Sequence, residues 1–243
     1  MLEIEEIHTY YGESHILQGI SLHVDHGECV AFLGRNGMGK TTTLRTIMNL
    51  SPARKGSVRF KAQDITHLPP FRIARLGIGY VPEDRALFGS LTVVENLRVP
   101  FLNLERHTPK KWREFEAQIY ALFPILSERR GQLASSLSGG EQQMLATARA
   151  LIAGERMILL DEPTEGLAPV VVQDLIGAFQ KVKAQRQTML LVEQNIHTAM
   201  KVADRCYILE KGRIKLEERM DALIRRPDLL QQYLGVTEAS EAR

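Results

Sequence analysis

Residues 34–41 constrain this chain more than any other stretch of its sequence. They read GRNGMGKT, which fits the pattern G-x-x-x-x-G-K-[ST], and they follow the apolar run CVAFL at residues 29–33. A short run of this kind is typical of a strand buried on both faces. A helical stretch at about residues 40–50 follows directly. The order strand, glycine-rich loop, helix predicts a loop that wraps around a phosphate group.

Each residue type in this loop suits the binding of a nucleotide. Glycines let the backbone approach a phosphate closely and turn successive N–H groups toward it, and the helix N-terminus adds about half a positive charge. We expect Lys40 to reach the β- and γ-phosphates of ATP and the Thr41 hydroxyl to bind Mg²⁺. The alternative is a glycine-rich turn that only connects strand to helix. The residues expected to hold the nucleotide here are Gly34, Arg35, Asn36, Gly37, Met38, Gly39, Lys40, Thr41 and Thr42.

Two adjacent carboxylates, Asp161 and Glu162, supply the second part of the expected site. They follow the apolar run MILL at residues 157–160. We expect Asp161 to orient Mg²⁺ through its water shell and Glu162 to polarise the water that attacks the γ-phosphate in line. Alone, two carboxylates after an apolar strand are more often a solvent-exposed strand end. Their pairing with the phosphate loop favours the catalytic interpretation.

A third motif, LSGGEQ at residues 137–142, precedes a helix expected at about residues 141–153. A serine and glycine amides before a helix form another anion site, although the same segment could be an ordinary helix start. Together with the two motifs above, it resembles the signature of ATP-binding cassette (ABC) ATPases, and the match covers essentially the whole chain. In that family the segment faces the γ-phosphate bound by the other subunit of a head-to-tail dimer. The residues implied for this contact are Ser138, Gly139, Gly140 and Glu141.

The fold class follows from the spacing of the apolar runs and from the resemblance. Short apolar runs at residues 29–33, 157–160 and 189–192 alternate with helical stretches, which predicts a mainly parallel, helix-covered sheet. The resemblance implies an α/β protein, a P-loop NTPase with the ABC ATPase cassette fold and an N-terminal antiparallel β subdomain. We predict a single nucleotide-binding domain over residues 1–243, with a helical subdomain inserted at about residues 92–153.

The last part of the chain is expected to be helical from about residue 220 to residue 234. Pro227 would start a last short helix there, because proline suits the first helical turn. Residues 237–243 are expected to form a polar, frayed tail.

The resemblance also assigns an aromatic residue and an acidic loop residue. Tyr11, before Gly12, resembles the aromatic residue that stacks on adenine; Tyr10 is the alternative, and either could simply pack in the core. The loop after the run that ends at Val81 usually carries a glutamine, whereas this chain has Glu83. Glu83 could still approach Mg²⁺ and the attacking water, and the alternative is a solvent-facing acid.

Two further departures from the family pattern concern catalysis and the dimer contact. Gln194 stands where a switch histidine is usual. A glutamine can donate an amide hydrogen bond to the γ-phosphate but cannot become cationic. His197, one helical turn beyond, is expected to be a surface histidine. Ala168 stands where the dimer-contact segment commonly carries an aspartate.

These departures narrow the resemblance to LivF-type ATPases of branched-chain amino acid importers. The matching stretches are DEPTEGLAP at residues 161–169, VEQN at 192–195 and VPE at 81–83. ATPases of urea or short-amide importers share much of this pattern, so the solute stays open. The resemblance implies ATP and Mg²⁺ as cofactors and two transmembrane permeases as partners. It also implies a second, LivG-like ATPase or a second copy of this chain, and indirectly an extracytoplasmic solute-binding protein.

Other classes of ABC ATPase fit the sequence less well. EQN at residues 193–195 argues against the ATPase of a lipopolysaccharide-export machine. Cassette ATPases that act on the ribosome or DNA generally have two cassettes or long coiled-coil inserts, and we find neither pattern. The 31 basic residues nearly balance the 29 acidic ones, so no nucleic-acid partner is expected.

Composition predicts a soluble, intracellular protein, and the resemblance implies that it attaches to a membrane through its permease partners. No stretch of the 243 residues approaches the roughly 18 to 20 apolar residues of a membrane span, and the first residues do not read as a signal peptide. Cys29 and Cys206 suit a reducing cytoplasm. We expect a peripheral subunit at the cytoplasmic face of the bacterial inner membrane. Residues 83–97 would contact the permease, with Phe88 touching it; core packing is the alternative account of the apolar side chains there.

Overall fold

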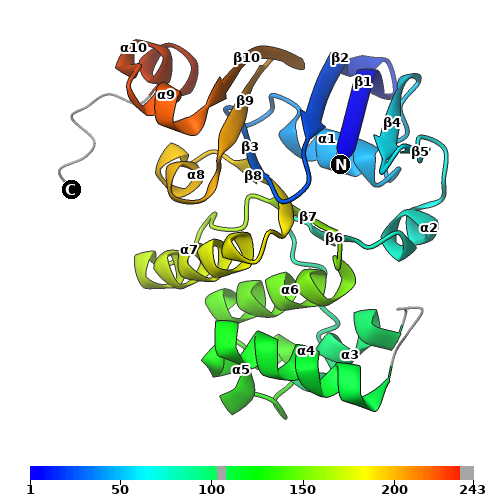
Figure 1. Ribbon diagram of the computed structural model, residues 1–243, viewed down its shortest axis with the longest axis vertical. Coiled ribbons are helices and arrows are strands. Elements are labelled where there is room, and N and C mark those ends of the chain that lie inside the picture. The colour runs from blue at the N-terminus through cyan, green and yellow to red at the C-terminus, as the bar shows by residue number, and fades with distance from the viewer. Residues whose placement is uncertain (103–107, 236–243) are drawn as a thin grey trace.

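Two β-sheets and the helices around them make up the computed structural model, which describes residues 1–102 and 108–235 (Figure 1). The strands are β1 (Leu2–Tyr11), β2 (Ser14–Val24), β3 (Cys29–Leu33), β4 (Lys55–Phe60), β5 (Gln63–Asp64), β6 (Ile78–Val81), β7 (Met157–Asp161), β8 (Thr188–Glu193), β9 (Arg205–Glu210) and β10 (Arg213–Arg219). The α-helices are α1 (Lys40–Ile47), α2 (Pro70–Arg75), α3 (Val93–Leu102), α4 (Pro109–Leu122), α5 (Pro124–Glu128), α6 (Gly139–Ala153), α7 (Pro169–Ala184), α8 (Ile196–Val202), α9 (Met220–Ile224) and α10 (Pro227–Leu229). Two short helical segments are η1 (Ala134–Ser136), a 3₁₀ turn, and η2 (Leu230–Leu234), a π turn.

The larger sheet has the strand order β10-β9-β3-β8-β7-β6. Its strands run parallel from β9 to β6, and only β10 pairs antiparallel, with β9. Every residue of β3, β7 and β8 is buried, which explains why their sequences are continuous apolar runs. The predicted mainly parallel, helix-covered sheet is therefore confirmed.

Alternate residues of β3 face two separate hydrophobic cores. Cys29, Ala31 and Leu33 pack into a core shared with α6 and α7, whereas Val30 and Phe32 pack into a core shared with α1, β1 and β2. This alternation is the normal period of a strand. The sheet thus lies between two apolar layers and holds the loops at its strand ends in fixed positions.

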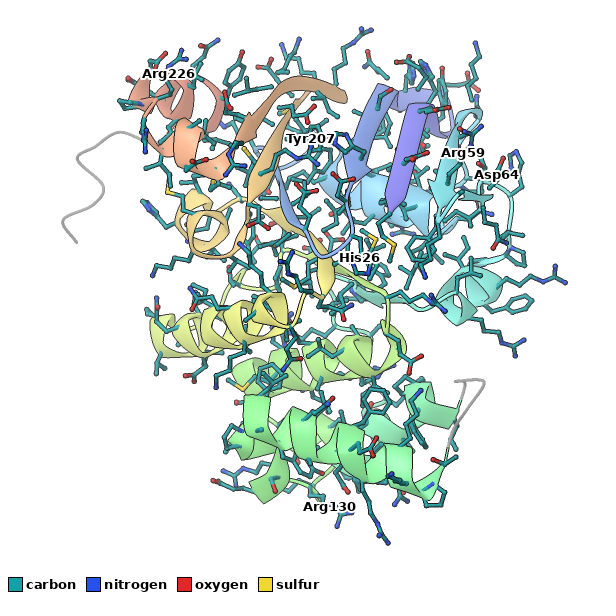
Figure 2. All side chains as sticks on the ribbon, in the orientation of Figure 1. His26, Arg59, Asp64, Arg130, Tyr207 and Arg226 are labelled. Carbon is teal, nitrogen blue, oxygen red and sulfur yellow. The ribbon has the colours of Figure 1, made fainter. Side chains whose placement is uncertain are left out.

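The smaller sheet is antiparallel, with the order β2-β1-β4-β5 (Figure 1). The expected N-terminal antiparallel β subdomain is therefore confirmed, but β4 and β5 complete it from beyond the phosphate loop. The sequence gives little signal for β4, because Val58 and Phe60 are its only buried residues. The two sheets are joined by polar contacts: the Arg205 Nη2 donates to the His23 carbonyl (2.9 Å) and the His23 N–H donates to the Tyr207 hydroxyl (3.2 Å). Tyr207, on β9, is labelled in Figure 2.

The helices α3 to α6 form a layer at the opposite end of the molecule from β1 and β2 (Figure 1). Among the described residues between 92 and 153, the only β pairing is an isolated bridge between Thr92 and Leu133. The helix α6 packs against both α3 and β6, so it joins this layer to the large sheet. The division of the chain into one domain with an inserted helical subdomain stays a prediction.

The helix after the phosphate loop is shorter than expected, whereas the C-terminal helical region has the expected extent. The helix α1 ends at Ile47 rather than at residue 50, and Asn49 takes a left-handed backbone conformation (φ 52°) that asparagine tolerates better than most residues. At the other end of the chain, α9, α10 and η2 fill the expected helical region, and Pro227 starts α10. The expected tail at 237–243 lies outside the described residues. No helix in the described part of the chain is both long and apolar enough to cross a membrane.

Candidate nucleotide site

The loop between β3 and α1 needs glycine at two positions for steric reasons. Gly39 has φ of 105°, and a Cβ there would lie 2.8 Å from Leu17 Cδ2. A Cβ at Gly34 would lie 2.6 Å from the Leu209 carbonyl oxygen. Only glycine fits such close approaches, so the loop passes tightly between β2 and β9 and turns sharply into α1.

A pocket of about 450 Å³ opens beside this loop. The expected site residues that line it are Tyr11, Asn36, Gly37, Gly39, Lys40, Thr41, Thr42, Glu83 and Glu162. The structure therefore brings together residues from β1, the phosphate loop, the loop after β6 and the end of β7. Three expected loop residues, Gly34, Arg35 and Met38, do not line the pocket, and Met38 instead accepts a contact from the Lys211 N–H through its sulfur (3.2 Å).

Lys40 and Glu162 meet in this pocket. Their Nζ and Oε1 atoms lie 3.0 Å apart, and both side chains are almost completely buried. Lys40 also donates to the Arg35 carbonyl (3.1 Å). The ammonium is therefore held at the bottom of the loop, where it can attract phosphate oxygens, and the carboxylate is held next to it.

Asp161 is fixed by hydrogen bonds on both of its oxygens. The Thr41 hydroxyl donates to Oδ1 (3.0 Å) and the Tyr80 hydroxyl donates to Oδ2 (3.2 Å). Burial raises the pKa of Asp161 to about 6, and the nearby charges of Glu162 and Glu83 act in the same direction. A cation beside this carboxylate would favour its charged form.

The oxygen donors at this position fit Mg²⁺ bound together with a nucleotide. Among the described residues, no group of three acidic, histidine or cysteine side chains is placed to hold a metal. Mg²⁺ commonly takes only one or two protein ligands, keeps waters and binds substrate phosphates. Thr41 and Asp161, which are hydrogen-bonded to each other, could supply such a pair of ligands, and Glu83 lines the pocket that contains Thr41.

The backbone at Glu162 has an uncommon conformation. Its φ is 45°, in the left-handed region that residues with a Cβ rarely adopt, and its N–H donates to the Val192 carbonyl (3.0 Å). This bond ties the end of β7 to the end of β8. The carboxylate is thereby turned back toward Lys40 instead of following the strand direction. Strained positions of this kind are often found at active sites.

Two carboxyl groups near Glu162 were not singled out from the sequence. Glu165 lines the pocket, and a carboxyl–carboxyl hydrogen bond with Glu162 raises its pKa. Glu193 is buried and accepts a hydrogen bond from the Thr164 hydroxyl (2.8 Å), and burial raises its pKa to about 7. The available signal for Glu193 was its place directly after the apolar run at residues 189–192. Tyr80, which bonds Asp161, was also missed.

The structure separates the two tyrosine candidates. Tyr11 lines the pocket, and its hydroxyl lies 3.1 Å from the Ser51 hydroxyl. Tyr10 instead stacks on His15, with ring centroids 4.2 Å apart, and lies under the Arg54 guanidinium. Of the two, only Tyr11 is placed to contact a nucleotide in this pocket.

Gln194 follows β8 and is exposed to solvent, and it is not among the described residues that line the pocket. The neighbouring Asn195 caps α8 by accepting from the His197 N–H (2.9 Å). His197 itself is exposed, as expected. A contact between Gln194 and a γ-phosphate stays a prediction.

The signature segment lies apart from the pocket in this chain. None of Ser138, Gly139, Gly140 and Glu141 is among the described residues that line it. Ser138 and Glu141 form a capping box at the start of α6: the Ser138 N–H donates to Glu141 Oε2 (2.8 Å) and the Glu141 N–H donates to Ser138 Oγ (3.3 Å). The segment is therefore an ordinary, well-formed helix start, as the alternative interpretation expected. A contact of the same segment with a partner's nucleotide stays a prediction.

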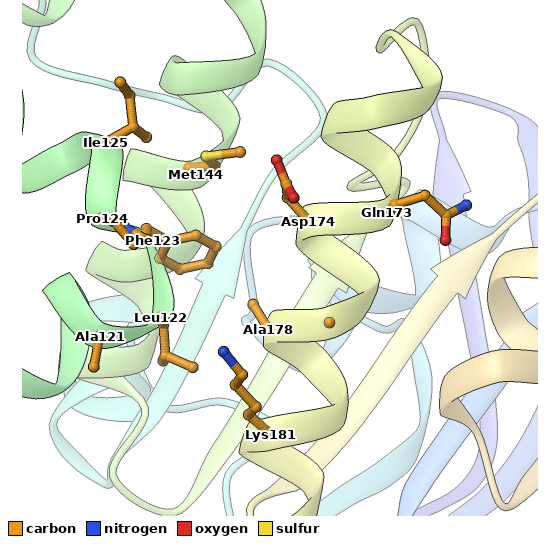
Figure 3. Close-up of a pocket in the computed structure, with 11 residues that line it drawn as sticks. Ala121, Leu122, Phe123, Pro124, Ile125, Met144, Gln173, Asp174, Ala178 and Lys181 are labelled. Atoms are coloured by element: carbon orange, nitrogen blue, oxygen red, sulfur yellow. The ribbon is translucent and has the colours of Figure 1, made fainter.

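A different pocket, of about 410 Å³, lies between α7 and the junction of α4 and α5 (Figure 3). Phe123, Pro124 and Met144 form much of its wall, and Asp174 and Lys181 project from α7 at its edge. None of the expected nucleotide or metal ligands lines it. Its apolar wall and its position away from the phosphate loop make it a poor candidate for the catalytic site.

Comparisons with known proteins agree with this geometry. The family model for ABC transporters matches residues 17–165. The high-affinity branched-chain amino acid transport ATP-binding protein BraG of Pseudomonas aeruginosa is 40% identical over 97% of this chain and 100% of its own length. The lipopolysaccharide export ATP-binding protein LptB of Haemophilus influenzae is 32% identical over 97% of each chain.

Solved structures give the same result for the fold. A dimeric ATP-binding cassette in a post-hydrolysis state, bound to ADP and Pi, has a TM-score of 0.81 at 26% identity, over 90% of this chain and 99% of that chain. The chain therefore belongs to the ABC transporter family as an ATP-binding subunit, and it is an ATP-hydrolysing enzyme.

Proposed function

We propose that this chain is the LivF-type subunit that powers an importer of branched-chain amino acids. The observation that carries the proposal is the full-length, 40% identity to BraG, a branched-chain amino acid transport protein by name. The stretches 161–169 and 192–195 support the same assignment. The similarity to LptB is lower, at 32%, so lipopolysaccharide export is the second candidate and urea or short-amide import the third.

In the proposed reaction, Lys40 releases Glu162 and binds the β- and γ-phosphates of ATP through its ammonium group. The freed Glu162 carboxylate then polarises the water that attacks the γ-phosphate, because its left-handed backbone turns it into the pocket. Thr41 and Asp161 would hold Mg²⁺, which neutralises charge on the β- and γ-phosphates when bound. Tyr80 keeps the Asp161 carboxylate in place through its hydroxyl.

The separation of the signature segment from the pocket supports a head-to-tail dimer. If Ser138, Gly139 and Gly140 contact ATP at all, the contact must come from another subunit, because these residues do not line the pocket of their own chain. We further propose that the partner is a second, LivG-like ATPase that carries the switch histidine, since Gln194 cannot become cationic. Transporter-like turnover by an ATP-dependent homodimer of the isolated chain would contradict this.

The surface after β6 is proposed to contact the permease. Phe88 is 44% exposed, whereas Val93 and Leu97 are fully buried in the core, so only part of the apolar segment is free for a partner. Replacing Phe88 with alanine should leave ATP hydrolysis intact and reduce uptake. Ile224→Ala, which removes a similarly exposed apolar side chain elsewhere, is the matched control. Wild-type uptake by the Phe88→Ala transporter would contradict the contact.

The substrate is tested with the reconstituted transporter. The chain would be purified together with candidate permeases, a second ATPase and a solute-binding protein from the same genome, and placed in vesicles. We expect ATP hydrolysis to rise when the binding protein carries leucine, isoleucine or valine. Stimulation by urea or amides instead, or co-purification with lipopolysaccharide-export proteins, would replace the proposal with one of the other candidates. In each case we expect the chain to sit peripherally on the cytoplasmic face of the bacterial inner membrane.

A further inference from the structure

The loop between β6 and α3, residues 82–92, is held against α6 by two arginines. Glu83 lines the nucleotide pocket at one end of this loop, and Phe88 is exposed near the other. Arg85, between them, donates from Nε to Gln143 Oε1 and from Nη1 to Gln142 Oε1, both at 3.1 Å. The loop that carries a catalytic candidate is thus bonded directly to the first turns of the signature helix.

The contact of Arg85 extends to both sides of the signature segment. Gln142 donates from its own amide to the Ala134 carbonyl (3.1 Å), in the η1 turn that precedes the segment. The guanidinium also lies close to Gly139, since a Cβ there would be 3.6 Å from Arg85 Nη1. A displacement of Arg85 would therefore change contacts on both sides of the signature segment, at Ala134 through Gln142 and at Gly139 directly.

Arg149 makes the reciprocal contact, from α6 back to the loop. Its Nη1 donates to the Ala86 carbonyl (2.7 Å), and its guanidinium stacks on the Phe88 ring at 4.7 Å. Arg149 lies seven residues after Gln142, two turns along the same helix face. The arginine is mostly buried, and this burial lowers its pKa. The middle of the loop, from Arg85 to Phe88, is therefore in contact with α6 at two places.

The backbone between the two arginine contacts is strained. Arg85 has φ of 65° and Ala86 has φ of 45°, so two consecutive residues with a Cβ adopt the left-handed conformation. Such conformations persist only when surrounding contacts hold them, and they favour a second arrangement once those contacts loosen. The bonds of Arg85 and Arg149 to and from α6 help to hold this turn. The bond from the Arg85 N–H to the Pro82 carbonyl (2.9 Å) and the bonds of Asn96 with the Phe88 backbone hold it as well.

We propose that Arg85 is a positioning residue that passes the state of the nucleotide pocket from Glu83 to the signature segment of the same chain. Arg149 anchors the same loop at Phe88, on the surface assigned to the permease. Nucleotide bound in one pocket therefore changes the segment that this chain presents to its partner's nucleotide. The inference rests on the proposed function in that it takes the pocket to bind ATP and the segment to face a partner subunit.

The test is amide hydrogen exchange on the full-length isolated chain, with and without Mg²⁺ and a non-hydrolysable ATP analogue. In the wild type we expect the analogue to change the exchange rates of residues 137–143 several-fold. Arg85→Ala should abolish that change while the affinity for the analogue stays within about twofold. Arg85→Lys, which can reach only one glutamine at a time, should retain part of it. Arg113→Ala removes an exposed arginine of α4 and should behave as wild type.

A purely structural role would give a different result. Exchange at residues 137–143 would then rise equally with and without the analogue, and the nucleotide-dependent change would survive in Arg85→Ala; this outcome overturns the proposal. If Arg85→Ala does not fold, the Gln142→Ala/Gln143→Ala variant removes the two acceptors instead and should also abolish the change. An unchanged wild-type exchange pattern despite bound analogue also overturns the inference. Failure to bind the analogue at all would instead contradict the proposed function.

Discussion

Two helices of this chain begin with glycine-rich loops, and their N-termini are built in opposite ways. The helix α1 begins after Gly39, which is left-handed, and no side chain caps it among the described residues. The helix α6 begins after Ser138, whose side chain caps it, with Glu141 completing a reciprocal pair of bonds. The first residues of α1 line a pocket. At the start of α6, by contrast, the N–H groups of Ser138 and Glu141 are bonded to each other's side chains.

This difference agrees with the proposal that one chain completes the first site, whereas the second acts on a partner's nucleotide. The α1 terminus has Lys40, Thr41, Asp161 and Glu162 around it, almost all buried, so its positive end and its catalytic groups converge within one subunit. The α6 terminus has an exposed serine, the Glu141–Arg129 pair (3.3 Å) and the Arg85 guanidinium, which donates to Gln142 (3.1 Å). Its stability does not depend on a ligand, because its cap is satisfied locally.

The largest effect is expected at the first of these sites. Replacing Glu162 with glutamine should lower the kcat of ATP hydrolysis by about 10²- to 10⁴-fold, the usual contribution of a general base, while nucleotide binding is retained. The measurement is phosphate release under saturating ATP, with a fluorescent nucleotide titration for binding. Glu128→Gln, the same change on the exposed surface of α5, should leave both unchanged. Near-normal turnover in Glu162→Gln would assign the base to another residue.

The second site is tested with two substitutions of one serine. Ser138→Asp keeps an N-cap but places a negative charge where a partner's γ-phosphate is expected, so it should lower ATP hydrolysis of the assembled transporter by about 10²-fold with little change in Tm. Ser138→Ala should instead cost about 1 kcal/mol of folding free energy, because the cap is lost. Thermal unfolding and transporter ATPase assays separate the two. If the two variants hydrolysed ATP equally fast, the segment would only cap α6 and would not contact a partner's nucleotide.

Tyr11 and Tyr10 test which aromatic side chain contacts the nucleotide at the first site. Tyr11→Ala should weaken ATP binding by about tenfold, since stacking of a base on an aromatic ring contributes roughly 1 to 3 kcal/mol. Tyr10→Ala should leave ATP affinity unchanged, because that ring packs on His15 and Arg54. Equilibrium titration with a fluorescent ATP analogue measures both affinities. A stronger effect from Tyr10 would reverse the assignment.

The last effect is on the folding stability of the protein, which Glu193 makes dependent on pH. Burial raises the pKa of Glu193 to about 7 from an ordinary value of 4.5. Between these values the folded chain holds a proton that the unfolded chain has released. The free energy of unfolding therefore decreases, and the protein becomes less stable, as pH rises through this window. Glu193→Gln should stabilise the protein by about 1 to 3 kcal/mol at pH 8 and hardly at all at pH 4.5. Urea unfolding at the two pH values checks this; equal effects at both would contradict it.

The reach of sequence-based prediction differs between the two sites for a physical reason. The phosphate loop, the strand before it and the carboxylates at the end of β7 are each encoded by a short continuous pattern. Lys40, Thr41 and Glu162 line one pocket, whereas Gly34, Arg35 and Met38 do not. Tyr80, Glu165 and Glu193 had no such pattern, because their importance comes from burial and from neighbours distant in sequence. Tyr10 and Tyr11 could not be separated from sequence, since adjacent strand residues face opposite sides and the twist of β1 decides which side is the pocket.

The sequence alone determined the chemistry of the chain: the phosphate loop, the paired carboxylates, the signature segment and the mainly parallel sheet that holds them. The loop, the carboxylates after an apolar run and the sheet follow from local steric and hydrophobic patterns, whereas the signature segment was identified by its resemblance to a known family. Tertiary structure alone decided the contacts between segments far apart in the chain. It brought Lys40 to Glu162, kept the signature segment out of its own pocket, and set Arg85 and Arg149 between the loop after β6 and α6. Such contacts depend on how whole elements pack, and no local pattern encodes them.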